Sequence, residues 1–128
     1  DIMNVHDCGR LINPALAEAK VHGGMSMAIG YALSEKLLYD EKTGKPLNNN
    51  LLDYKLSTFM DHPDLNAAFI ENYEPTSAYG TKALGEPPTC SPAPAIRNAI
   101  LQAVDVALQE IPIRPHLLFE EFRKAGLI

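Results

Sequence analysis

The stretch INPALAEAKVHGGMSMAIGYALSEKLLYD, residues 12–40, decides the fold of this chain. Asn13 suits a helix N-cap, and Pro14 suits the first helical position, where the missing N–H of proline leaves nothing unpaired. Apolar residues then recur at helical spacing: Leu16, Ala17, Val21, Met25, Ala28, Ile29, Ala32 and Leu33. The pattern predicts one long helix with an apolar face.

Two glycines in the middle of this helix, Gly23 and Gly24, need a compensating interaction. Each costs roughly 1 kcal/mol of helix stability relative to alanine. Gly30 follows at a spacing that places it on the same face. Tight packing against another element and close approach to a ligand both explain these glycines, and the residues alone leave both interpretations open.

Three shorter patterns predict strands around the helix. Residues 2–8 alternate between apolar and polar and stop at Gly9. Residues 37–48 read as a strand that leads into a hairpin-like turn at Thr43 and Gly44. Residues 66–75 alternate again, after an irregular and turn-rich segment, and end at Pro75.

Two further helices are predicted in the second half of the chain. Residues 91–111 carry an apolar face made of Ile96, Ile100, Val104 and Leu108. A last helix follows residues 112–115 and carries Leu117, Leu118 and Phe122. The order of elements predicts an α+β fold over residues 1–128, with helices packed on one side of a mixed sheet.

Composition limits the classes of function. A length of 128 residues with 46% hydrophobic residues suits one globular domain. A net charge of -5 gives no basic surface for nucleic acid or anionic membrane. No apolar run is long enough to span a bilayer, so we expect a soluble, cytoplasmic protein. Because the chain opens directly on a strand pattern without Met, we expect a segment of a longer polypeptide.

Most chemically reactive residue types in the chain have no motif around them. Cys8 and Cys90 lie far apart without zinc-ligand spacing, so both are predicted to be small buried apolar residues. The four histidines share no ligand spacing, and no metal ligand is assigned. Asp53, Tyr54 and Asp61 lie in the irregular segment, where side-chain oxygens commonly cap turns. The GxSxG, phosphate-loop and HExxH motifs are absent.

Glu86 is the exception, because it lies between Gly85 and two prolines in YGTKALGEPP, residues 79–88. Gly85 permits close approach of the backbone, and Pro87 is expected to restrict Glu86 to extended conformations. A general base must be held within hydrogen-bond reach of the proton that it removes. Glu86 is therefore a candidate base, while a turn cap remains the structural alternative.

Five blocks in this order resemble one enzyme family: VHDCGRLINP (5–14), VHGGMSMAIGYALSEKLLYDEKTG (21–44), LLDYKL (51–56), YGTKALGEPP (79–88) and APAIRNAI (93–100). The chain resembles the C-terminal part of the molybdenum-binding subunit of the xanthine dehydrogenase and aldehyde oxidase family. The resemblance covers nearly the whole chain and is closest to the xanthine dehydrogenase branch. It implies a segment of a molybdopterin-binding domain that, by itself, is inactive and does not hold molybdenum stably.

The resemblance also implies roles for particular residues. Glu86 corresponds to the general base, which takes a proton from a hydroxyl on the molybdenum of the pterin cofactor. Gly23, Gly24, Leu84 and Gly85 are implied to approach the cofactor through their backbone. The family usually has Gly and Gln where this chain has Ala19 and Lys20, and Lys20 is expected to reach the cofactor phosphate as a point charge.

The resemblance implies an oxidative hydroxylation of a purine such as xanthine or hypoxanthine, or of a related N-heteroaromatic, with oxygen derived from water. Electrons are implied to leave through iron–sulfur clusters and FAD on other domains or subunits. The upstream part of the same subunit is an expected partner, and a homo-oligomer is possible on this view. An aldehyde oxidoreductase, a carbon monoxide dehydrogenase large subunit and a non-catalytic interaction domain remain alternatives.

Overall fold

The computed structural model describes all residues 1–128 and contains two strands and three α-helices. Strand β1 (Ile2–Asp7) is followed by helix α1 (Pro14–Leu33), strand β2 (Leu65–Ile70), helix α2 (Pro92–Val104) and helix α3 (Pro115–Lys124). Short 3-10 turns lie at Phe59–Asp61, Ala78–Gly80 and Pro87–Thr89. The α+β class predicted from the sequence is confirmed. No helix is both long and apolar enough to cross a membrane.

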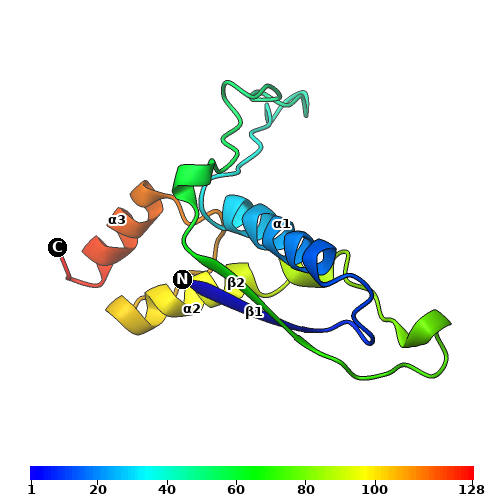
Figure 1. The fold of residues 1–128 in the computed structure, drawn as a ribbon. Coiled ribbons are helices and arrows are strands. Elements are labelled where there is room, and N and C mark those ends of the chain that lie inside the picture. The colour runs from blue at the N-terminus through cyan, green and yellow to red at the C-terminus, as the bar shows by residue number, and fades with distance from the viewer.

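The sheet consists of β1 and β2 alone, and the two strands run parallel, with Ile2 beside Leu65 and Asp7 beside Ile70. The prediction of a mixed sheet is therefore wrong for this chain. The third predicted strand also stops at Ile70 and does not reach Pro75. Beyond Ile70 the chain leaves the strand direction and forms the projecting loop at the right of Figure 1.

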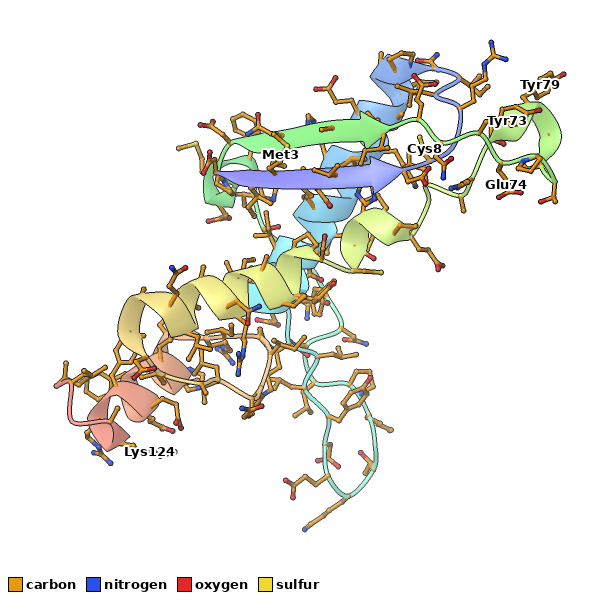
Figure 2. All side chains as sticks on the ribbon, turned by 90° about the horizontal axis from the view of Figure 1, so that it is seen from below. Met3, Cys8, Tyr73, Glu74, Tyr79 and Lys124 are labelled. Atoms are coloured by element: carbon orange, nitrogen blue, oxygen red, sulfur yellow. The ribbon has the colours of Figure 1, made fainter.

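Helix α1 covers one face of this small sheet (Figure 1). As predicted, Asn13 caps its first turn, because the Asn13 side chain accepts a hydrogen bond from the N–H of Leu16 at 3.1 Å. The buried face of α1 contacts β2, α2 and the turn Pro87–Thr89. The opposite face of the sheet has no helix over it in Figure 2, and Met3 on β1 is 62% exposed.

The predicted strand at residues 37–48 is wrong. This segment pairs only through one isolated antiparallel bridge between Tyr39 and Pro46, which closes a turn around Gly44. The hairpin-like turn is thus present, but no strand extends from it, because a strand needs a partner and none lies alongside. The segment forms the loop that projects above α1 in Figure 1.

Helices α2 and α3 enclose a small second core. Helix α2 ends at Val104, since Asp105 adopts a left-handed conformation with φ 55° and ψ 33°. The prediction that Leu108 continues this helix is therefore wrong. Leu108 instead lies in the connecting segment and is buried there, where the N–H of the Arg97 side chain donates to its carbonyl at 3.0 Å. This core consists of Val106, Leu108 and Ile113, packed against Ile96, Ile100, Val104, Leu118 and Phe122.

Candidate active site around Glu86

The segment that carries Glu86 is tied to the end of β1 on its N-terminal side. The backbone N–H of Lys82 donates to the carbonyl of Cys8 at 2.7 Å. Gly9 makes this approach possible, because a Cβ at Gly9 would lie only 2.3 Å from the carbonyl oxygen of Gly80. The φ of Gly9 is +67°, a conformation that side-chain-bearing residues rarely adopt.

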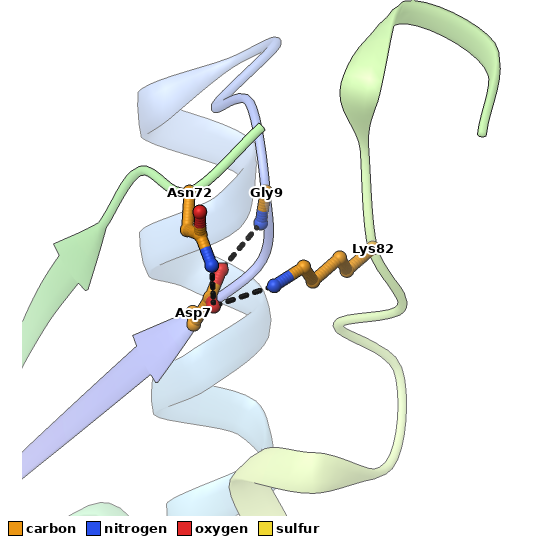
Figure 3. Close-up of polar contacts among 4 residues, drawn as sticks. All are labelled: Asp7, Gly9, Asn72 and Lys82. Carbon is orange, nitrogen blue, oxygen red and sulfur yellow. Dashed lines mark hydrogen bonds and ion pairs between the residues drawn. The ribbon is translucent and has the colours of Figure 1, made fainter. Parts of the chain in front are cut away.

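The carboxylate of Asp7 strengthens this first attachment (Figure 3). One oxygen accepts from Lys82 Nζ at 2.6 Å and from Asn72 Nδ2 at 3.5 Å, and the other accepts from the N–H of Gly9 at 2.9 Å. The hydrogen bond from Lys82 is the largest cause that lowers the pKa of Asp7 below its ordinary value, followed by that from Gly9. Asp7 is therefore a charged link between β1 and the segment that leads to Glu86.

A second attachment holds the chain just beyond Glu86. Asn4 on β1 is buried, and its Nδ2 donates to the carbonyl of Pro88 at 3.1 Å. Its Oδ1 accepts from the hydroxyl of Ser91 at 3.1 Å. On α1, the hydroxyl of Tyr31 donates to the carbonyl of Thr89. The turn is thus bonded to both β1 and α1.

Helix α1 also packs directly on this turn through Gly24. A Cβ at Gly24 would lie 2.5 Å from the Cβ of Pro88, closer than real contacts allow. At Gly23 a Cβ would meet nothing within 4 Å. Of the two open interpretations, tight packing therefore explains Gly24, whereas packing within this chain does not explain Gly23.

Glu86 lies between these two attachments, at the start of the turn Pro87–Thr89. Its backbone has φ -92° and ψ -33°, so the prediction that Pro87 keeps it extended is wrong. The N–H and the hydroxyl of Thr89 both donate to the backbone carbonyl of Glu86, at 2.9 and 2.8 Å, and favour this helical conformation. The carboxylate itself is exposed and makes no hydrogen bond or ion pair within the chain.

An open pocket of about 850 Å³ lies beside this carboxylate. Its lining comes from β1 and from the segment around Glu86: Met3, Asn4, Val5, His6, Ala83, Gly85, Glu86, Pro87, Cys90 and Ser91. His6 is a second titratable group in this pocket; burial lowers its pKa, and its Nε2 has no hydrogen-bond partner. The pocket therefore brings a free carboxylate and an imidazole to one concave surface.

A second open pocket, of about 670 Å³, lies where Gly23 is exposed on α1. It is lined by His22, Gly23, Ser26, Phe59, Met60, His62, Pro63, Asp64 and Leu65. Ser26 Oγ lies 3.1 Å from His62 Nε2, and the Nε2 of His22 is buried without a hydrogen-bond partner. The Nε2 of His22 also lies 3.9 Å from Glu18 Oε1, an ion pair when His22 is protonated. Bare helix backbone beside His22 and His62 fits the approach of a flat, polar cofactor.

The structure brings only some of the predicted site residues together. Gly85 and Glu86 line the first pocket, and Leu84 adjoins them in sequence. Gly23 lines the second pocket, and Lys20 is exposed one turn earlier on α1. The cofactor contacts predicted for Lys20, Gly23, Gly24, Leu84 and Gly85 stay predictions.

Sequence reasoning missed Asn4 and Tyr31, which hold the turn beyond Glu86. No signal in the sequence marked Asn4, because its apolar neighbours Met3 and Val5 predict the opposite face as the buried one, whereas the structure exposes both and buries Asn4. Tyr31 carried no signal either, since tyrosine is common on helix faces that contact other elements.

The remaining polar predictions concern turns and cysteines. Asp61 caps a turn, accepting from the N–H and the hydroxyl of Thr58, both at 2.7 Å, and Asp53 accepts from Asn50 Nδ2 at 2.9 Å. These structural roles are confirmed. Cys8 is buried as predicted, but Cys90 is exposed, so that prediction is wrong. Cys90 follows a turn that faces the first pocket, not the core.

Comparison with known proteins places the chain in a family. It is 55% identical over 127 residues to the xanthine dehydrogenase molybdenum-binding subunit of Escherichia coli O157:H7, a match that covers 99% of this chain. The chain belongs to the xanthine dehydrogenase and aldehyde oxidase family. The molybdopterin cofactor-binding domain family matches residues 1–63, which contain β1, α1 and most of the lining of the second pocket.

More distant relatives in the family show the same match. The aldehyde oxidoreductase molybdenum-binding subunit PaoC of Escherichia coli is 32% identical over 106 residues, or 82% of this chain and 14% of that protein. The crystal structure of quinoline 2-oxidoreductase from Pseudomonas putida 86 superposes with a TM-score of 0.87 at 32% identity, covering 95% of this chain and 16% of that one. The chain spans 17% of the length of its 55%-identical relative.

Proposed function

We propose that this chain is part of a molybdenum hydroxylase and supplies the general base of its active site, Glu86. The substrate is a purine such as xanthine or hypoxanthine, or a related N-heteroaromatic compound. The placement of Glu86 carries the proposal, because its carboxylate is free, faces an open pocket and sits on a turn attached on both sides. A turn cap would have its carboxylate oxygens occupied by backbone N–H groups, and those of Glu86 are not.

The choice of substrate class rests on relative similarity. The chain is 55% identical to a xanthine dehydrogenase subunit and 32% identical to an aldehyde oxidoreductase subunit. This difference favours a purine over an aldehyde. An aldehyde oxidoreductase remains the second candidate, supported by PaoC, and it would use the same carboxylate for the same proton transfer.

In the proposed reaction, Glu86 accepts a proton as the oxygen nucleophile is activated. When bound, the molybdenum–pterin cofactor supplies the two-electron oxidation and the water-derived oxygen. The anchored turn limits the movement of Glu86, which a base needs in order to meet its proton at hydrogen-bond distance. His6, on the same pocket wall, presents a neutral imidazole near pH 7, because burial lowers its pKa.

The residues of this chain that we propose to hold the cofactor lie on α1 and in the segment just before Glu86. Gly23 offers bare backbone at the second pocket, and Leu84 and Gly85 offer backbone next to Glu86. Lys20 is placed to attract a phosphate as a point charge. For Gly24 we retain only an indirect role, because Pro88 occupies the space in front of it.

Other parts of the enzyme complete the site in this proposal. Both pockets described above are open and one face of the sheet is uncovered, so we expect the upstream part of the same subunit to close them. Iron–sulfur clusters and FAD on other domains or subunits would remove the electrons. We propose that the enzyme is cytoplasmic. Self-association into a homo-oligomer is compatible with this proposal.

Glu86→Gln in the full-length enzyme tests the function. Glu41→Gln in the loop 37–48 is the matched control, since Glu41 is exposed and lines neither pocket. Turnover of xanthine and hypoxanthine is measured beside molybdenum content. We expect Glu86→Gln to retain molybdenum and lose at least about 100-fold in kcat, while Glu41→Gln matches the wild type. Full turnover in Glu86→Gln would refute the role of base, and turnover of aldehydes alone would favour the second candidate.

A further inference from the structure

The turn after Glu86 depends on one buried polar side chain, Asn4. Asn4 is 5% exposed and lies at the middle of β1, between the sheet and the turn Pro87–Thr89. An apolar residue at this inward position would be the ordinary choice, because buried polar groups stabilise a fold only when they are hydrogen-bonded. Both ends of the Asn4 amide are in fact bonded.

The two bonds of Asn4 reach two different points of the turn. Its Nδ2 donates to the carbonyl of Pro88, and its Oδ1 accepts from the hydroxyl of Ser91, each at 3.1 Å. A carbonyl can only accept, so the nitrogen must face Pro88 and the orientation of the amide is determined. Making both bonds needs a donor and an acceptor on one short side chain, which an asparagine amide supplies, whereas leucine has neither and an ionised aspartate has no donor.

These bonds fix the turn close to Glu86. Pro88 lies two residues after Glu86, and its other side packs on Gly24 of α1. Asn4 thus holds Pro88 from the strand while Gly24 holds it from the helix. No hydrogen bond holds the Glu86 carboxylate itself, so the backbone of the turn determines only the point from which this side chain extends.

We infer that Asn4 is a positioning residue: it clamps the turn 87–91 to β1 and thereby sets the point from which the Glu86 side chain extends at the pocket. The inference rests on the proposed function, in which Glu86 is the base. Small displacements of a catalytic group, of about 1 Å, can lower a rate by about 100-fold. The loss of either Asn4 bond would loosen the turn on its β1 side, because Asn4 supplies the hydrogen bonds from β1 to Pro88 and Ser91.

The test uses the full-length enzyme with Asn4→Leu, which keeps the shape of the side chain and removes both bonds. Glu41→Gln in the loop 37–48 is again the control, since Glu41 is exposed and lines neither pocket. Ser91→Ala removes only one of the two bonds and serves as a milder variant if Asn4→Leu does not fold. Hydrogen exchange of the peptides covering 83–91, molybdenum content, kcat and KM are measured.

We expect Asn4→Leu to raise the exchange of residues 85–91 by at least about 10-fold while the centre of α1 stays protected. We expect kcat to fall by about 10- to 100-fold with KM within about threefold of the wild type. Ser91→Ala should change both quantities in the same direction and by less. Unchanged exchange in both variants would overturn the inference.

A double variant separates positioning from general destabilisation. If Asn4 acts through Glu86, Asn4→Leu combined with Glu86→Gln is no slower than Glu86→Gln alone. Losses that multiply would show that Asn4 affects turnover independently, and they would overturn the inference. If Glu86→Gln alone keeps full turnover, the proposed function fails. Increased exchange of residues 85–91 in Asn4→Leu would then show that Asn4 holds the turn, but with no general base to position.

Discussion

The contrast between Gly23 and Gly24 offers a direct test of how α1 packs. Gly23→Ala and Gly24→Ala make the same change at neighbouring positions of one helix. In each, replacing glycine should stabilise the helix by about 1 kcal/mol, because alanine loses less backbone entropy. At Gly23 the new methyl group meets nothing within 4 Å, so the full gain is expected.

At Gly24 the same methyl group would lie 2.5 Å from the Cβ of Pro88 and 3.2 Å from its carbonyl carbon. Those atoms belong to a proline ring and to backbone, which cannot rotate away. Forcing an extra methyl group into such a contact typically costs about 1–3 kcal/mol. Because the propensity gain is common to both variants, Gly24→Ala should be less stable than Gly23→Ala by about 1–3 kcal/mol.

The assay is native-state hydrogen exchange of α1 in the full-length subunit without bound cofactor, because the cofactor is proposed to lie against Gly23. It reports the local free energy of opening without assuming two-state unfolding of the whole protein. We expect the exchange protection of α1 to be higher in Gly23→Ala than in the wild type, and in Gly24→Ala to be equal to that of the wild type or lower. Gly24→Ala should also displace Pro88 and reduce turnover. Equal exchange protection in the two variants, within about 0.5 kcal/mol, would refute the packing argument.

Three further predictions concern charged groups near the site. The hydrogen bond from Lys82 lowers the pKa of Asp7, so this link stabilises the fold fully above the ordinary Asp pKa of 3.8 and is lost as the pH falls through the lower folded value. Asp7→Asn should therefore exchange the Lys82 amide faster than wild type near pH 6, and the difference should shrink as the pH falls below 3.8. Burial lowers the pKa of His6, so the wild type should lose stability as the pH falls below 6.5, the ordinary pKa of histidine. His6→Gln should remove this loss, which thermal unfolding at pH 7 and pH 5 measures. Lys20→Ala should lower molybdenum content modestly, since an exposed ion pair between Lys20 and the cofactor phosphate would contribute about 0.2–1 kcal/mol. Lys42→Ala, in the loop 37–48, should not change the molybdenum content.

The sequence predicted the elements that depend on local interactions. The cap at Asn13, the proline at position 14 and the apolar spacing were enough for α1, because helix hydrogen bonds join residues four apart. Helix α3 followed from the same kind of pattern. The C-terminal end of α2 did not, because the apolar spacing continues to Leu108, while tertiary packing buries Leu108 in a non-helical segment.

The sheet was less predictable because strand pairing joins residues that are far apart in the sequence. Residues 37–48 have a strand pattern but no neighbouring strand, whereas β1 and β2, separated by more than a helix, pair in parallel. An alternating pattern states which face of a strand is apolar; it does not state which strand lies beside it.

The candidate site divides in the same way. The sequence by itself determined that Glu86 is the unusual carboxylate, because its glycine and proline neighbours and the order of the surrounding blocks are properties of the chain. Only the tertiary structure decided its helical backbone, its free carboxylate and its place at the pocket. The physical reason is that Pro87 disfavours a helical Glu86 only weakly, whereas hydrogen bonds from Thr89, the clamp of Asn4 and the packing of Gly24 on the turn act together and outweigh it.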